Sequence, residues 1–197
     1  MVARVELVAR LERAFLDHGY EHLTMTGLAK AVDVTRRTLY NYFSSKEEAF
    51  RFLILNVNAH AVEIGMAAGR GALADGRDAV AILATILDTR YGNTRRRLAT
   101  SPHAIEINDQ AFRRCRDIMI ASAVGFQSEL ASFIIELEEE SLLRVKPDVG
   151  AEVLAQLLAD GARGTNQSLP PIDPAKLHQR YRSMVRALLH GVTRPAL

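Results

Sequence analysis

The chain has 197 residues, of which 48% are apolar and 24% are charged, and its formal net charge is +2. This is an ordinary globular composition, and so mild a positive charge does not by itself indicate a nucleic-acid partner. The longest uncharged apolar stretch, residues 118–128, is too short to cross a bilayer. The N-terminus has no apolar signal core, so we expect a cytoplasmic chain with no membrane partner.

The single cysteine, Cys115, excludes an internal disulfide. It lacks the cysteine and histidine neighbours of a zinc site, so we interpret it as a small core residue rather than a redox or metal-binding group. The sequence therefore predicts neither a metal site nor a cofactor.

Apolar residues recur three and four positions apart, and clusters with β-strand alternation are absent, so the sequence predicts an all-α fold. The first helix is expected to stop at Gly19, and its apolar face consists of Val5, Val8, Leu11 and Phe15. Another helix begins near Lys46. Four glycines are expected to interrupt it and to end a first module: Gly65, Gly69, Gly71 and Gly76.

Prolines mark the boundaries in the second half of the chain. Ser101-Pro102 breaks one segment, Lys146-Pro147-Asp148 ends a long central helix, and residues 169–174 form a stiff connector. The central helix carries an apolar stripe of Phe112, Cys115, Met119, Phe126, Leu130, Phe133 and Leu137. The last helix carries another, of Leu177, Tyr181, Met184, Val185, Leu188 and Leu189. We therefore predict a compact helical head, residues 1–47, and a larger helical body, residues 48–197.

Residues 24–50 have the punctuation of a helix-turn-helix followed by a third helix. Thr24 and Thr35 are placed to cap two short helices, and Asp33-Val34 forms the turn between them. Ser45 and Glu48 have capping-box spacing at the start of the next helix. The residues expected to face inward from the two short helices are Leu28, Ala29, Val32, Leu39 and Phe43.

The second short helix exposes side chains suited to the major groove of double-stranded DNA: Thr35, Arg36, Arg37, Thr38, Tyr40 and Asn41. Arginine pairs with guanine and asparagine with adenine, whereas threonine and tyrosine bond phosphate oxygens. Between Val34 and Lys46 the chain has three basic residues and no acid. A lone arginine pair is more often solvated surface, but the capped helices, the turn and these side chains together favour DNA binding.

The head resembles the DNA-binding domain of the TetR family of bacterial transcriptional regulators over residues 4–50. The residues that carry the resemblance are Phe15-Leu16, Gly19-Tyr20, Thr24-Met25, Leu28-Ala29, Val34-Thr35, Thr38-Leu39-Tyr40, Tyr42-Phe43, Ser45-Lys46-Glu47 and Phe50. The resemblance implies that five side chains face the groove: Thr35, Arg36, Arg37, Thr38 and Asn41. It also implies four phosphate contacts: Thr24, Tyr40, Tyr42 and Lys46.

Two positions depart from the family pattern. The family usually has glycine where this chain has Asp33, and a left-handed aspartate costs on the order of 1 kcal/mol. The family also often has glycine where Arg37 stands, so the long charged side chain alters the groove surface. The operator sequence therefore cannot be transferred from relatives.

For the body, the resemblance implies dimerisation through residues 149–163 and 175–191. The expected interface residues are Val153, Leu154, Leu157, Leu158, Tyr181, Met184, Val185 and Leu188. It also implies an effector pocket among the middle helices, with candidate lining residues Leu83, Ile86, Leu87, Ile105, Phe112, Met119 and Phe126. An intramolecular core is the alternative for both sets. The basic run Arg95-Arg96-Arg97 is read as solvated surface in preference to an attractor of an acidic effector.

The resemblance thus implies a repressor that binds a near-palindromic operator as a homodimer and is released by a small-molecule effector. A constitutive DNA-binding dimer without an effector is one alternative. A helical enzyme is the other, because His103, Glu106 and Asp109 are spaced three apart, loosely like acid–base or metal ligands. No nucleophile motif or second ligand set accompanies them, so we do not expect an enzyme.

Overall fold

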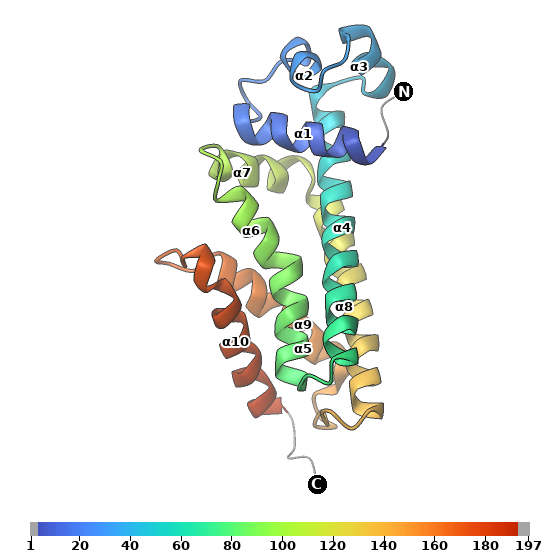
Figure 1. Cartoon of the computed structure of the whole chain (residues 1–197), viewed down its shortest axis with the longest axis vertical. Coiled ribbons are helices and arrows are strands. Elements are labelled where there is room, and N and C mark those ends of the chain that lie inside the picture. The colour runs from blue at the N-terminus through green and yellow to red at the C-terminus, as the bar shows by residue number, and fades with distance from the viewer. Residues whose placement is uncertain (1–3, 193–197) are drawn as a thin grey trace. The chain divides into compact units, whose positions relative to one another are not determined.

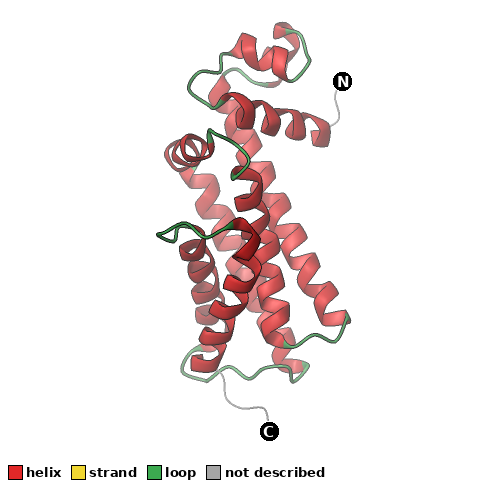
Figure 2. Cartoon of the chain, turned by 60° about the vertical axis from the view of Figure 1, so that its left-hand side comes forward, coloured by secondary structure: helices red, strands yellow, loops and turns green. Residues whose placement is uncertain are grey.

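The computed structural model describes residues 4–192, and all regular structure within them is helical (Figures 1 and 2). This confirms the all-α expectation. The elements are, in chain order, α1 (Arg4–His18), α2 (Met25–Ala31), α3 (Arg36–Tyr42), α4 (Lys46–Ala74), α5 (Ala79–Leu87), the π-helical segment η1 (Asp88–Gly92), α6 (Asn93–Leu98), α7 (Ala104–Arg114), α8 (Arg116–Glu139), α9 (Gly150–Asn166), the 3-10 segment η2 (Pro174–Lys176) and α10 (Leu177–Val192).

The chain forms two compact units, and their limits differ from the predicted head of residues 1–47. Unit 1 comprises Met1–His60 and Arg97–Ala121, and unit 2 comprises Ala61–Arg96 and Ser122–Leu197. Both α4 and α8 are continuous helices with residues in each unit. The sequence carries no turn signal inside either helix, and the domain boundary at residue 47 stays a prediction.

Unit 1 buries the apolar faces of its helices around three aromatic rings. Phe15, Tyr20 and Phe50 are almost fully buried, and their ring centroids lie 5.0–6.0 Å apart. The buried face of α1 differs from the predicted one, because Leu7 is buried whereas Val5 is 83% exposed. Cys115 belongs to this core, and burial raises the pKa of its thiol to about 11, as expected of an inert core cysteine.

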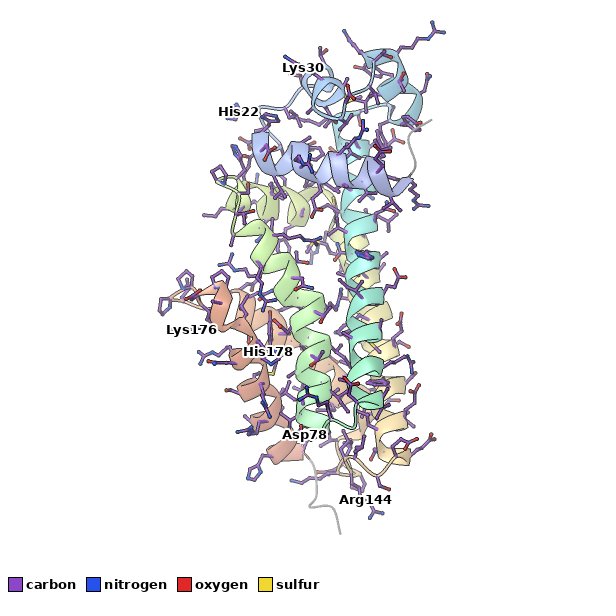
Figure 3. The ribbon with its side chains drawn as sticks, viewed as in Figure 1. His22, Lys30, Asp78, Arg144, Lys176 and His178 are labelled. Atoms are coloured by element: carbon purple, nitrogen blue, oxygen red, sulfur yellow. The ribbon has the colours of Figure 1, made fainter. Side chains whose placement is uncertain are left out.

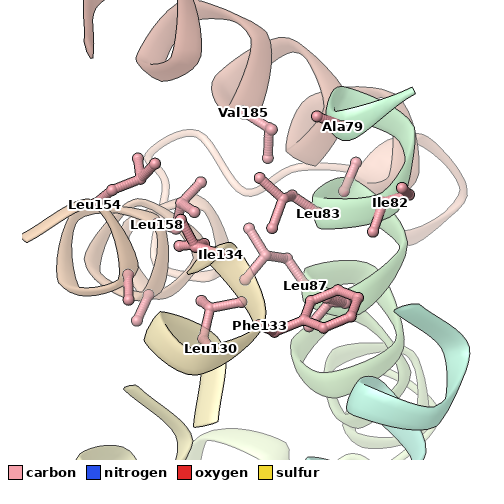
Figure 4. Close-up of a cluster of buried hydrophobic side chains, with 14 of the residues drawn as sticks. Ala79, Ile82, Leu83, Leu87, Leu130, Phe133, Ile134, Leu154, Leu158 and Val185 are labelled. Carbon is pink, nitrogen blue, oxygen red and sulfur yellow. The ribbon is translucent and has the colours of Figure 1, made fainter. Parts of the chain in front are cut away.

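Unit 2 has a core formed by α5, α8, α9 and α10 (Figure 4). Leu83 and Leu87 of α5, Ile134 of α8 and Val185 of α10 are fully buried and point toward one another. Asp78, at the start of α5 (Figure 3), accepts a hydrogen bond from Ala81 N at 2.7 Å and caps this nearly all-apolar helix.

Three of the four glycines expected to break the helix lie inside α4, which runs unbroken to Ala74. A Cβ on Gly69 would overlap the Ile86 side chain, and a Cβ on Gly65 would lie 3.2 Å from Ile86 O, which is a tight contact. Both glycines therefore allow close helix packing instead of ending a module. The predicted central stripe is also interrupted, since Cys115 separates α7 from α8.

Both α4 and α8 are long and apolar enough in composition to cross a membrane. The prediction rested on uncharged stretches, and these two helices do not contradict it because each carries charged residues, among them Glu63 and Glu129. Helices that form the core of a globular domain pass the same test, and each of these two contributes fully buried residues to a unit core, as Phe50 and Phe133 show.

Gly69→Ala is expected to destabilise the protein, because its Cβ would overlap the side chain of the fully buried Ile86. Overpacking of this kind costs about 1–3 kcal/mol. Gly71→Ala is the matched control on the same helix: no described residue lies within 4 Å of its Cβ, so it should stabilise by about 0.5–1 kcal/mol. Urea denaturation of both variants measures the difference, and equal shifts would contradict the close packing.

Candidate DNA-binding site

The turn between α2 and α3 is held by local hydrogen bonds that the sequence predicts. Thr24 caps α2 by accepting a bond from Gly27 N at 3.0 Å. At the other end, Val34 N donates to Ala29 O and Asp33 N to Lys30 O, which is a Schellman motif. Asp33 has φ +56°, so it does occupy the left-handed position where the family has glycine.

The α3 helix is short, and its position depends on its cap and on one buried side chain. Thr35 caps it, accepting a bond from Thr38 N at 3.1 Å. Leu39 is fully buried in the core of unit 1, where α2 contributes Leu28 and Ala29. The burial of Leu39 orients the opposite face of α3 toward solvent.

Exposed side chains of α3 form the candidate DNA-binding face. Arg36, Arg37, Tyr40 and Asn41 are exposed, as are the caps Thr24 and Thr35, whereas Thr38 and Tyr42 are half-buried. The Arg36 guanidinium lies over the Tyr40 ring, 5.4 Å from its centroid. The Thr38 hydroxyl bonds that of Thr35 at 2.8 Å. Tyr42 packs beside Phe43, so its ring supports the core of unit 1.

Lys46 does not project freely as a phosphate contact would. Its Nζ donates to Tyr20 O at 2.6 Å and lies 4.3 Å from the centre of the Tyr20 ring. Burial, followed by repulsion from Arg114, lowers the pKa of this ammonium. Lys46 therefore ties α4 to the segment after α1, and its phosphate contact stays a prediction.

The start of α4 has the predicted cap at Ser45, but the carboxylate of Glu48 bonds Ser44 instead of Ser45. Glu48 N donates to Ser45 Oγ at 3.1 Å, as a capping box requires. The Glu48 carboxylate, however, accepts from Ser44 N at 2.6 Å and from the Ser44 hydroxyl at 2.7 Å. These bonds lower the pKa of Glu48 and hold the segment that joins α3 to α4.

Glu106 on α7 is a structural residue, whereas the sequence offered it only as a possible acid–base or metal-binding group. Its Oε1 accepts from Tyr20 N at 2.7 Å and Glu21 N at 2.6 Å, and its other oxygen lies 3.3 Å from His103 Nδ1. Gly19, at φ +72°, leaves the space that this carboxylate occupies. Glu106, supported by His103, thus holds α7 to the chain after α1, and no sequence signal marks a contact between residues 86 positions apart.

Glu106→Gln is expected to destabilise unit 1 by about 1 kcal/mol near neutral pH, because a carboxylate accepts amide hydrogen bonds more strongly than an amide does. Partial burial raises the pKa of Glu106, but the bonds from Glu21, Tyr20 and His103 outweigh it, and the net pKa is lowered. The charged carboxylate therefore stabilises the fold above its unfolded pKa of about 4.3, and this stability is lost as pH falls through the lower folded pKa. Thermal melts from neutral pH downward should show the two proteins converging in acid; a constant gap would contradict this.

The effector-pocket candidates are not brought together into one cavity. Four of them lie fully buried in the core of unit 2: Leu83, Ile86, Leu87 and Phe126. The other three belong to unit 1, where Ile105 and Phe112 are 80% and 51% exposed and Met119 packs on the core. Two surface hollows, of about 430 and 380 Å³, are lined by none of the seven. The predicted set mixed core residues with surface residues because both recur at helical spacing.

The interface candidates divide into buried and accessible residues. Four are fully buried within one chain, so the expectation that they contact a second copy is wrong for Leu154, Leu158, Tyr181 and Val185. Val153 and Leu157 are 49% and 38% exposed on α9. Met184 and Leu188 on α10 are half-buried, and Met184 packs against Gly161.

Two basic residues of the Arg95–Arg97 run are paired within the chain. Arg96 bonds Asp88 at 2.6 Å, and Arg97 lies 3.5 Å from Glu12. Their charges are therefore used in the fold, which supports the interpretation that this run does not attract an effector.

Comparison with known proteins places the candidate site in a family. Residues 7–51 match the family model described as bacterial regulatory proteins, tetR family. Over 45 residues the chain is 44% identical to the HTH-type transcriptional regulator TcmR of Streptomyces glaucescens, a match that covers 23% of this chain and spans only 20% of TcmR.

Similar solved structures extend over nearly the whole chain. The TetR family transcriptional regulator PfmR from Thermus thermophilus has a TM-score of 0.61 at 18% identity and covers 95% of this chain and 99% of its own. SmeT, the repressor of the Stenotrophomonas maltophilia multidrug efflux pump SmeDEF, has a TM-score of 0.64 at 13% identity, covering 98% of this chain and 92% of its own. With the helix-turn-helix geometry of α2 and α3, these matches show that residues 7–51 are similar to the DNA-binding domain of tetR-family regulators and that the fold of the chain is the one found in such regulators.

Proposed function

We propose that this protein represses transcription by binding a near-palindromic operator as a homodimer and is released by a small-molecule effector. The observation that carries the proposal is the exposed face of α3. This face presents Arg36, Arg37, Tyr40 and Asn41, and Leu39 on the opposite face is buried in the core. Repression is proposed because the structurally similar SmeT is a repressor.

The contacts divide by the chemistry of the side chains. Arg37 and Asn41 are proposed to read base edges, since guanidinium and amide groups pair with guanine and adenine in the major groove. Arg36, which lies over the Tyr40 ring, and the half-buried Thr38 complete the groove surface. Thr24, Thr35, Tyr40 and Tyr42 are proposed to bond phosphate oxygens through their hydroxyl groups.

DNA sites selected from a random pool by the purified protein test the operator claim. We expect one near-palindromic sequence with half-sites whose centres lie roughly 34–36 Å apart or a multiple of that distance. Binding to this sequence should exceed binding to random duplex by at least about 10³-fold at physiological salt. A protein that recovered no consensus, or bound all duplexes equally, would contradict the proposal.

A dimer is proposed through α9 and α10. Val153 and Leu157 lie four residues apart on α9 and are apolar and exposed, so they share one accessible face. Pairing this face with a second copy would relate two recognition helices by a twofold axis. A near-palindromic operator requires this symmetry.

Replacing both Val153 and Leu157 by glutamate is expected to give a monomer that binds the operator weakly, because like charges would meet at the apolar face. Neither side chain belongs to the core, so the fold should persist. Leu169→Glu is the control, since Leu169 is 90% exposed in the loop before η2. Light scattering at micromolar concentration measures the change; a monomeric wild type with intact operator binding would refute the dimer.

Effector release is proposed as a shift between two states of the protein. An effector can weaken operator binding only by its differential affinity for these states, typically about 1–3 kcal/mol of coupling. Operator DNA must then weaken effector binding by the same factor. Titrations with and without operator that gave equal effector affinity would favour the alternative, a constitutive DNA-binding dimer.

A further inference from the structure

The π-helical segment η1 places a charged side chain in the core of unit 2. Arg90 is only 5% exposed, and its guanidinium carbon lies 4.3 Å from the centre of the Phe126 ring and 4.7 Å from that of Tyr91. The two rings meet edge to face at 5.8 Å. Short π-helical segments inside α-helical stretches are frequently found at functional sites.

Three polar atoms of unit 2 are buried without a hydrogen-bond partner among residues 4–192: Arg90 Nε, Tyr91 Oη and Ser122 Oγ. Ser122 lies one turn before Phe126 on α8, and therefore on the same face of that helix. Burial lowers the pKa of the Arg90 guanidinium, whereas the neighbouring Tyr91 phenol acts in the opposite direction. The Glu129 carboxylate has the smallest effect of the charges that act on this pKa.

The neighbouring polar groups of the same segment are paired. Asp88 bonds Arg96 at 2.6 Å and lies 3.3 Å from His178 Nδ1. Asn166 accepts from the Tyr181 hydroxyl at 2.5 Å and donates to Tyr91 O at 3.3 Å. The polar groups around η1 therefore generally have hydrogen-bond or ion-pair partners. The exceptions are Arg90 Nε and Tyr91 Oη.

Packing against α4 keeps Arg90 in place. A Cβ on Gly65 would lie 3.0 Å from Arg90 Cβ, so α4 approaches η1 at glycine distance. The long side chain consequently has a fixed base. Packing against the rings does not by itself require a buried cation. An apolar residue of similar length would fill this space without the free-energy cost of removing a charge from water.

Arg70 shows how this unit otherwise places a cation on an aromatic ring. Its guanidinium lies 5.2 Å from the centre of the Phe133 ring. It also bonds Glu136 at 2.9 Å, and its side chain is 59% exposed. Arg70 is thus paired with a carboxylate and reaches solvent, whereas Arg90 is buried against two aromatic rings.

We propose that Arg90, with Tyr91 and Ser122, binds the carboxylate of an organic acid, whose apolar or aromatic body packs beside Phe126. A guanidinium binds a carboxylate through two parallel hydrogen bonds, and the hydroxyl groups of Tyr91 and Ser122 add donors. This assignment rests on the proposed function, and it gives the effector a chemical class, an apolar monocarboxylate.

Arg90→Met in the full-length chain tests the unliganded state. Methionine keeps the apolar stem and removes the buried charge, so the Tm without ligand should rise by about 2–4 °C or more. Arg70→Met is the matched control, and it should not raise the Tm because its charge is exposed and paired. A lower Tm for Arg90→Met would make Arg90 a structural residue and overturn the proposal.

Benzoate and its uncharged analogue benzamide test the ligand class, because they share a shape and differ in charge. Calorimetric titration of the full-length wild type should show benzoate binding about tenfold or more tighter than benzamide. Tyr91→Phe and Ser122→Ala, which leave the core filled, should each weaken benzoate and not benzamide, and Arg70→Met should change neither. Equal binding of the two compounds, or no binding of benzoate, would overturn the proposal.

These titrations contain no DNA, so their outcome is separate from that of the proposed function. A wild type that binds its operator and ignores benzoate would retain the proposed function and lose this inference. A wild type that binds benzoate through Arg90 without recognising an operator would do the reverse.

Discussion

Leu39→Ala is expected to destabilise unit 1 by about 2–5 kcal/mol, the usual cost of truncating a fully buried leucine. The effect on DNA binding should be larger than any contact residue would give alone. Leu39 is the fully buried residue of α3, and without it the seven-residue helix keeps only the partly buried Tyr42 against the core of the unit. Urea denaturation and operator titration of the same preparation measure both effects.

Leu55→Ala is the matched control for this substitution. Leu55 lies on α4 in the same unit but is 49% exposed, so its truncation should leave a much smaller gap and cost well under half as much. If both variants lost the same stability, or if Leu39→Ala kept full operator affinity, then Leu39 would not be what positions the recognition helix.

Arg37→Ala is expected to reduce operator affinity by roughly 1–3 kcal/mol, which is about fivefold to more than a hundredfold. Arg37 is exposed on α3 and stands where the family often has no side chain, so it is proposed to read one base edge, guanine by preference. Preference at one position of each half-site should relax. Binding to random duplex should fall much less.

Arg144→Ala removes the same charge from an exposed loop of unit 2 (Figure 3) and controls for net charge. Binding curves for both variants on operator and random duplex at several salt concentrations separate base contacts from phosphate contacts. An equal loss for Arg37→Ala on the two duplexes would make Arg37 a phosphate contact.

Features that depend on neighbours a few residues away could be predicted from the sequence. Thr24 and Thr35 cap their helices as expected, because a cap joins a side chain to a backbone N–H three residues on. Asp33 is left-handed as its place in the turn suggested. The outward orientation of Arg36 and Arg37 follows from helical spacing once Leu39 is assigned to the core.

Periodicity could not distinguish a core within one chain from a surface offered to a second. Leu154 and Leu157 occupy the same helix and the same apolar pattern, yet one is fully buried and the other is 38% exposed. The predicted interface and pocket therefore mixed both kinds of residue. Only the packing of α5, α9 and α10 separates them.

The sequence by itself determined the helical class, the helix-turn-helix and its exposed side chains, because these arise from interactions within about four residues along the chain. The tertiary structure alone decided the roles of Lys46, Glu106 and Gly69, whose partners are Tyr20, Tyr20 with Glu21, and Ile86. It likewise decided that Arg90 is buried. In each case the chemistry depends on a residue distant in the chain, and no local pattern records which distant residue the fold will bring near.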